Sequence, residues 1–340
     1  MGSRQGWTAR PVAGAVCAAV FYSLWAVLLF LPHAKSLSSS FRLLYAVNPA
    51  VAAAGVFFLS RRWVAGWMPA ATAGWVYGFG PFGLSFIGFH PLTGFTFAAV
   101  PWLLLPAVYW HRRYRPTPMR FLVRAVFCLL PFAFIIVFFW TFSQHWAGRL
   151  FLLPQKTMLS GYDFLGLFFP LSMTGRPVVL SVTHFGLPAL LMGVFVYVSA
   201  QRVAVLILPA VGLVLAFLNP VFGVSPVIWA ALPMVFLAVL SGVGIQSLMW
   251  AGKNDSKWVL CCVLTAGVTG GISWLLSMSN QSMVYYNSAL LYLISTLVFG
   301  VVFLLSRASL RWPTVRWLLL AGAALTDCYI SGRWLIEKLL

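Results

Sequence analysis

The stretch PVIWAALPMVFLAVLSGVGIQSLMW, residues 226–250, decides the class of fold because it carries no charged side chain over its whole length. About 20 apolar residues in a helix are enough to cross the hydrocarbon core of a bilayer. The stretch is followed closely by Lys253, and similar apolar runs closed by Arg or Lys recur along the chain. This pattern predicts an integral membrane protein whose helices cross the bilayer repeatedly.

The composition supports the same class. Hydrophobic residues make up 62% of the 340 residues and charged residues only 8%, which excludes a soluble globular fold. The net charge of +18 comes from 22 basic and 4 acidic residues, but the cations punctuate the apolar runs instead of forming one basic patch. We therefore expect no nucleic-acid partner and a single integral membrane domain over residues 1–340.

The apolar runs predict an all-α transmembrane bundle of about eleven spans, within a range of ten to twelve. The predicted spans are 12–32, 42–60, 64–88, 93–110, 121–142, 177–199, 203–220, 226–250, 258–279, 284–306 and 313–333. The first run is too long for the apolar part of a signal peptide, so we expect it to be retained. A cytoplasmic N-terminus places fifteen Lys and Arg inside and seven outside, which fits the positive-inside rule. The prediction is a multi-pass inner-membrane protein with its C-terminus outside.

The longest segment between predicted spans, residues 143–176, lies outside in this topology. It is too apolar for a solvated loop, and Pro154, Gly161 and Pro170 divide it into pieces too short to cross a membrane. We expect short helices that lie in the interface or re-enter the membrane, because they satisfy their backbone while burying their apolar side chains. This outer segment is where the sequence directs the search for a site.

Several stretches resemble a known group of membrane enzymes. NPAVAAAGVFFLSRRW (48–63), AGWVYGFGPF (73–82), YDFLGLFFPLSMTG (162–175) and FLNPVFGVSPVIWAALPMVFLAVLSGVG (217–244) look like the middle of YfhO-like members of the GT-C superfamily. The resemblance covers roughly residues 48–248. It implies a GT-C-like helical bundle and an activity on sugars carried by polyprenyl phosphate in the assembly of envelope glycans.

The sequence departs from that family in its first outer loop. GT-C enzymes usually carry an acidic residue in a long loop there, whereas HAKSLSSS (33–40) is short and holds no Asp or Glu. Two hypotheses from different classes follow. One is a GT-C-type glycosyltransferase. The other is a non-catalytic structural or accessory subunit of a larger membrane complex, built on a degenerate GT-C scaffold.

Asp163 is the only acidic residue of the outer segment and the candidate catalytic residue. It can act as a base or metal partner toward a lipid-linked substrate. Alternatively, it caps the short helix beginning at Phe164 or pairs with a nearby cation. The candidate ligands for the phosphate of a polyprenyl carrier are His145, Arg149, Lys156 and Arg176. In the alternative interpretation, such cations only reach toward ordinary phospholipid headgroups.

Histidine and cysteine spacing shows no metal-binding or haem-binding pattern, so we expect no metal and no cofactor. The five cysteines fall within apolar runs, where small buried side chains are typical. Asp327 lies inside the last predicted span, next to Cys328. It either pairs with a group from another helix, such as His184, or caps a short terminal helix. Both alternatives remain open from the sequence.

Overall fold

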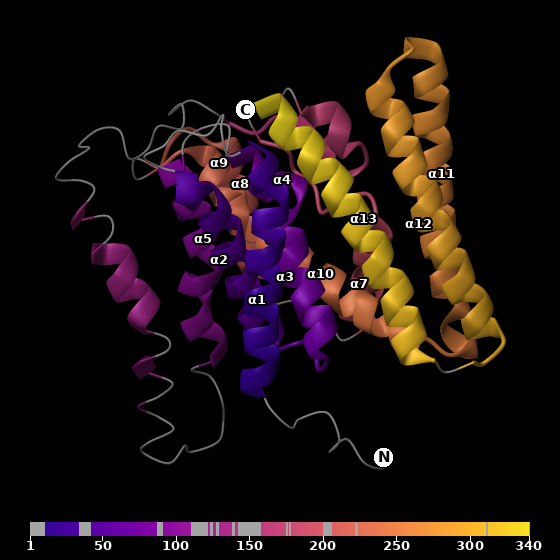
Figure 1. The fold of residues 1–340 in the computed structure, drawn as a ribbon, viewed down its shortest axis with the longest axis horizontal. Helices are drawn as coiled ribbons and strands as arrows, with labels where there is room; N and C mark the ends of the chain where they lie inside the picture. The colour runs from indigo at the N-terminus through magenta and orange to yellow at the C-terminus, as the bar shows by residue number, and fades with distance from the viewer. Residues whose placement is uncertain are drawn as a thin grey trace.

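The computed structural model is a bundle of helices (Figure 1). It describes residues 11–33, 42–86, 91–109, 158–174, 178–199, 206–221, 224–310 and 312–339, with Arg176 and short pieces of 122–141. The helices are α1 (Pro11–Phe30), α2 (Arg42–Ser60), α3 (Trp67–Phe79), α4 (Pro81–Ser85), α5 (Pro91–Tyr109), α7 (Gly186–Ser199), α8 (Ile207–Phe217), α9 (Pro226–Trp229), α10 (Ala231–Trp250), α11 (Ser256–Asn280), α12 (Met283–Arg307) and α13 (Pro313–Leu339). Three short 3₁₀ helices matter below: η3 (Gly161–Leu167), η4 (Pro170–Met173) and η6 (Lys253–Asp255).

Five helical segments are long and apolar enough to cross a membrane. They are Ala13–His33, Leu43–Ser60, Pro226–Trp250, Lys253–Asn280 and Met283–Arg307. These correspond to five of the predicted spans, which confirms a helical chain with several segments that are able to cross a membrane. The total of about eleven stays a prediction, and parts of the expected span over 121–142 lie outside the described residues.

Three predicted spans differ from the structure. The expected span over 64–88 is two helices, because the chain becomes extended at Gly80 and Pro81 then begins α4. The span expected from residue 177 becomes helical only at Gly186, and the one over 203–220 is the short helix α8. All three predictions differ for one reason. High hydropathy indicates that a segment is buried, but it does not distinguish burial inside the protein from burial in lipid.

Two helices, α3 and α10, form the centre of the bundle. One apolar cluster packs α3 against α1 and α13, and a second packs it against α2, α5 and the segment 178–182. Helix α10 also contributes to both clusters, through Ile245 and Leu248 to the first and Met234 and Val235 to the second. Both helices are therefore apolar on nearly every side because protein surrounds them.

Glycines let the central helices approach until their backbones touch. A Cβ added at Gly244 of α10 would overlap the carbonyl oxygen of Ala189, and one at Gly193 of α7 would overlap that of Leu240. A second contact of this kind joins α3, through Gly74, to the backbone of α2 at Ala53. Small residues at such crossings are the typical means by which membrane helices associate, because dispersion contacts increase as backbones approach.

Basic residues gather at the end of the bundle where α2, α10 and α12 finish, the lower end in Figure 1. They are Arg61, Arg62, Lys253, Lys257, Arg307 and Arg316. The loop after α2 is held to α10 at this end, since Gln246 Oε1 accepts hydrogen bonds from the Ala65 N–H (2.8 Å) and the Gly66 N–H (3.3 Å). The order and orientation of the crossings stay predictions.

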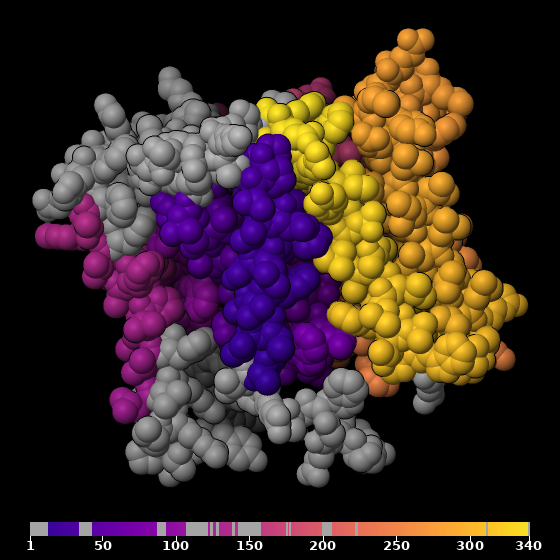
Figure 2. Space-filling view, viewed as in Figure 1, coloured from indigo at the N-terminus to yellow at the C-terminus, as the bar shows by residue number. Residues whose placement is uncertain are grey.

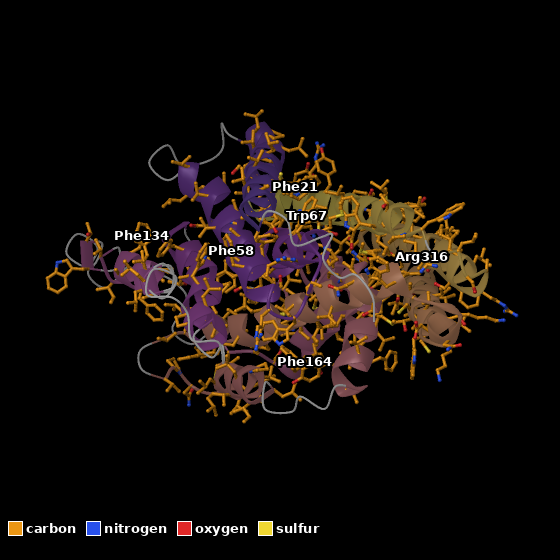
Figure 3. The ribbon with its side chains drawn as sticks, turned by 90° about the horizontal axis from the view of Figure 1, so that it is seen from below. Phe21, Phe58, Trp67, Phe134, Phe164 and Arg316 are labelled. Carbon is orange, nitrogen blue, oxygen red and sulfur yellow. The ribbon has the colours of Figure 1, made fainter. Side chains whose placement is uncertain are left out.

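Arg316 differs from the other cations because it is buried, with 1% of its surface exposed (Figure 3). Its Nη1 donates to the carbonyl of Ala251 (2.6 Å) just beyond the last residue of α10, and its Nη2 donates to that of Leu310 (2.8 Å). The last carbonyls of a helix have no partner within the helix and carry partial negative charge. Arg316 therefore caps α10 and fixes the start of α13 against it.

Helices α11 and α12 form a long antiparallel hairpin that projects from the body (Figures 1 and 2). The hairpin turns at Gln281, which adopts the left-handed conformation with φ 47°. Its outer faces expose large apolar side chains such as Leu264, Leu275, Leu297 and Leu304. Exposed apolar surface on this scale suits contact with lipid.

The crossing of α7 and α10 gives a direct test of the packing. We expect Gly244→Ala to lower the melting temperature of the protein in detergent, because overpacking at a backbone contact costs about 1–3 kcal/mol. The matched control is Gly300→Ala in α12, where a Cβ meets nothing within 4 Å. Equal melting temperatures for the two variants would show that α7 and α10 do not touch as described.

Candidate functional site

Asp163 lies at the third position of η3 and is 7% exposed. Its Oδ2 accepts hydrogen bonds from the backbone N–H of Ser160 (2.6 Å) and from the Ser160 hydroxyl (3.0 Å). This is the capping-box arrangement, in which an acidic side chain satisfies a free N–H group at the start of a helix. The capping role expected as one alternative is present, within η3 rather than at a helix beginning at Phe164.

Arg176 is the one candidate phosphate ligand that the structure places near Asp163, with 3.9 Å between Arg176 Nε and Asp163 Oδ1. Its side chain is half exposed. The other three candidates, His145, Arg149 and Lys156, lie outside the described residues. The described part of the outer segment does contain short helices, η3 and η4, as predicted.

All four carboxylates of the chain fall within the described residues, and each has an internal partner. The pairs are Asp163 with Ser160 and Arg176, Asp255 with the Gly252 N–H, Asp327 with His184, and Glu337 with Arg333. A general base or metal ligand needs lone pairs that face the substrate or ion. In this conformation every carboxylate has a hydrogen-bond or ion-pair partner within the chain.

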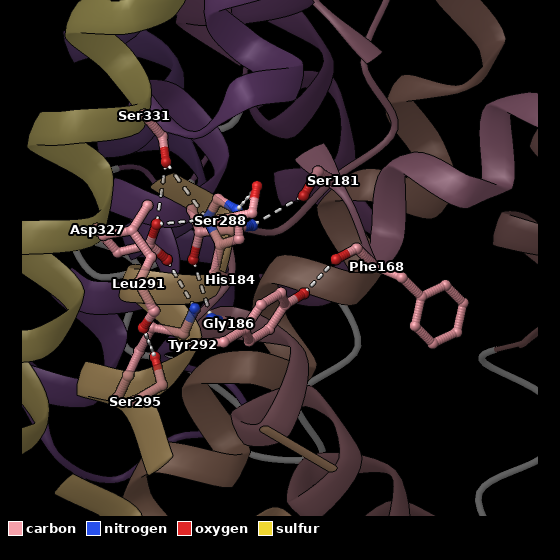
Figure 4. A network of polar contacts seen from close by, with 12 residues as sticks. Phe168, Ser181, His184, Gly186, Ser288, Leu291, Tyr292, Ser295, Asp327 and Ser331 are labelled. Carbon is pink, nitrogen blue, oxygen red and sulfur yellow. Dashed lines mark hydrogen bonds and ion pairs between the residues drawn. The ribbon is translucent and has the colours of Figure 1, made fainter. Parts of the chain in front are cut away.

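A buried polar network joins α13, α12 and the turn before α7 (Figure 4). Asp327 Oδ1 lies 2.8 Å from His184 Nδ1 and accepts from the Ser331 hydroxyl at 3.0 Å, while Oδ2 accepts from the Phe185 N–H at 2.6 Å. His184 is fully buried and Asp327 is 2% exposed. The proposed pairing of Asp327 with His184 is therefore confirmed, and α13 is a long helix instead of a short terminal one.

The second nitrogen of His184 faces Ser288 of α12, with 3.2 Å between Nε2 and Oγ. An ionised carboxylate can only accept hydrogen bonds, so the imidazole carries its proton on Nδ1 toward Asp327. In the neutral ring, Nε2 then accepts from the Ser288 hydroxyl. Serine, histidine and aspartate thus stand in the order that activates a serine nucleophile.

Ser288 behaves differently from its neighbours in α12. The hydroxyls of Ser295, Thr296 and Ser306 each donate to the carbonyl four residues earlier. This local bond is the usual outcome for a hydroxyl within a helix. Ser288 instead contacts a side chain from another element.

His184 sits on a strained turn. The preceding residue, Thr183, is fully buried and has φ 95°, which a β-branched residue adopts only when its surroundings enforce it. The turn is held by two hydrogen bonds, from the Thr183 N–H to Ser181 Oγ (3.1 Å) and from the Gly186 N–H to Thr183 Oγ1 (2.9 Å). These contacts fix the direction in which the imidazole points.

Sequence reasoning found His184 and Asp327 but missed Ser288 and Thr183. One serine among many in apolar helices gives no signal, because its partner lies 104 residues away. Among the described residues, no group of three or more His, Cys, Asp or Glu side chains is placed to hold a metal ion.

Removing the buried charge should unfold this region. Asp327→Asn places an amide N–H₂ where three donors converge, so we expect a loss of about 3 kcal/mol, seen as a lower melting temperature. Glu337→Gln is the matched control, because Glu337 forms an exposed pair with Arg333 on the same helix and should change stability little. A melting temperature for Asp327→Asn equal to that of the wild type would contradict the buried network.

No family model, no curated protein and no solved structure matches this chain. The likeness to GT-C proteins therefore stays a resemblance between stretches of sequence. The assignment of function has to be argued from the geometry of the described residues.

Proposed function

We propose that this chain is an accessory subunit of a larger membrane complex, in which a GT-C-like bundle serves as a scaffold. The observation that carries the proposal is the engagement of all four carboxylates in internal contacts. A glycosyltransferase of the family that the sequence resembles needs a carboxylate facing its substrates. Here the candidate, Asp163, is buried and holds the start of η3.

The proposed location is the inner membrane, with the basic end of the bundle in the cytoplasm. The support is the cluster of cations at the ends of α2, α10 and α12, since cytoplasmic loops carry an excess of Lys and Arg. The segment 158–174 and the end of α13 then lie at the outer side, together with Arg176 and Lys338. This orientation also places the start of α1 inside.

A second candidate function is transfer of a sugar from a polyprenyl phosphate carrier. The observation in its favour is that two cations lie at the same end as Asp163. Arg176 is half exposed, and Lys338 Nζ donates to Thr174 Oγ1 at 3.1 Å. Cations at a helix end can hold a phosphate by charge and hydrogen bonding.

Native mass spectrometry after gentle detergent extraction separates the two functions. We expect other protein chains to co-purify in a fixed ratio. The variant Asp163→Asn should keep both this complex and the envelope glycan of the wild type. The matched control is Glu337→Gln, an exposed carboxylate on α13. A chain that purifies alone with a bound lipid-linked sugar, and an envelope glycan that is lost with Asp163→Asn, would favour glycosyl transfer instead.

The orientation is tested by labelling single cysteines with a reagent that does not cross membranes. In a background without native cysteines, Arg62→Cys and Lys253→Cys should react only after the membrane is opened. Glu337→Cys should react in intact cells from which the outer barrier has been removed. Reaction of all three from one side would overturn the alternating arrangement.

A further inference from the structure

We propose that Ser288, His184 and Asp327 form a nucleophilic centre that accepts the acyl group of a membrane-lipid ester. This goes beyond the scaffold role, because it gives the bundle a nucleophilic chemistry that a scaffold does not need. The proposal stands on the two contacts of His184, 2.8 Å to Asp327 Oδ1 and 3.2 Å to Ser288 Oγ. It stands also on the strained residue Thr183, which presents the imidazole.

The arrangement satisfies the requirements for each role. Asp327 is fixed by Ser331 and by the Phe185 N–H, so it holds the imidazole in one tautomer and one orientation. In its neutral form, His184 directs the Nε2 lone pair at the Ser288 hydroxyl and can take the serine proton. Ser288 directs its hydroxyl to that lone pair and not to a backbone carbonyl, as its helical neighbours do. A serine kept only for packing has no need of this geometry.

The reaction follows from these positions. Ser288 Oγ forms a bond to the ester carbonyl carbon while its proton passes to His184 Nε2. The C–O bond to the lipid alcohol then breaks, and the leaving alkoxide takes the proton from Nε2. A water molecule that gives its proton to Nε2 attacks the acyl-serine. Release of the fatty acid returns the proton to Ser288 Oγ.

The position of Ser288 suits an ester of a membrane lipid. Ser288 is five residues from the start of α12, a distance of about 8 Å along the helix axis. Amphipathic helices bury their apolar faces about 5–10 Å into the boundary between headgroups and acyl chains. A helix α12 that begins at the membrane surface would place Ser288 at a similar depth. The surroundings of His184 are aromatic, with Tyr292 at 5.0 Å between ring centroids in an edge-to-face contact.

The segment 158–174 covers this centre, so the structure shows the centre closed to substrate. Tyr285, Ser288 and Tyr292 share one face of α12 by their spacing. Tyr292 donates a hydrogen bond to the Phe168 carbonyl, and the Tyr285 ring packs edge to face on Phe169 at 6.4 Å. Figure 4 shows the bond between Tyr292 and Phe168 close to His184 and Ser288. Displacement of this short-helix segment would break both contacts and uncover Ser288.

A fluorophosphonate bearing a long alkyl chain tests the proposal, since it reacts with activated serines. We expect the full-length protein in lipid vesicles to form one covalent adduct, mapped to Ser288 by fragmentation of the peptide. Ser288→Ala should abolish the adduct, and His184→Gln should slow it at least about 100-fold, the usual contribution of a general base. Tyr292→Phe, which lacks the hydroxyl that holds Phe168, should speed labelling severalfold.

The matched control is Ser295→Ala, which removes another buried serine of α12 and should label as the wild type does. The adduct on the wild-type protein is the primary measurement and does not depend on the folding of a variant. Failure of the wild type to react in vesicles would overturn the proposal. An adduct on a different serine, or equal labelling of His184→Gln, would overturn it as well.

Discussion

The carboxylate of Asp327 is the constraint on which the arrangement of this bundle depends. A charge that is 2% exposed among apolar helices is tolerated only when donors surround it. Its donors come from His184 and Phe185 in the turn before α7 and from Ser331 on α13 itself. Through His184 the same network reaches Ser288 on α12. A single buried group therefore holds α12, α13 and the turn before α7 in fixed positions relative to one another, although they are distant in sequence.

A second buried charge, of opposite sign, lies near the start of α13 and is also surrounded by hydrogen-bond partners. Arg316 is buried where α10 leaves carbonyls without partners, and its guanidinium donates to Ala251 and Leu310. A cation at a helix C-terminus interacts favourably with the helix dipole. The two buried charges of α13 are thus neutralised in different ways, one by side chains and a peptide N–H, the other by peptide carbonyls. Between them α13 is fixed in position along its own axis.

The sequence predicts the class of fold well and the site only in part. Runs such as Pro226–Trp250 and Met283–Arg307 are helices as expected, because length and hydropathy suffice to define them. Hydropathy failed at Gly80, where backbone geometry ends a helix inside a continuous apolar run. Asp327 and His184 stood out because charged and imidazole groups are rare in such runs. Ser288 became visible only when folding brought it to His184.

The position of α13 after α7, α10 and α12 in the chain has a consequence for how the protein is made. Synthesis runs from the N-terminus, so His184, Phe185, Ser288 and Ala251 are already made when Asp327 and Arg316 emerge. The hairpin of α11 and α12 can enter the bilayer as a self-contained pair, since its backbone is satisfied within each helix. Helix α13 then meets partners for both charges in the earlier helices, His184 and Phe185 for Asp327 and the Ala251 carbonyl for Arg316. The order of synthesis thereby spares the insertion machinery from placing two lone charges in lipid.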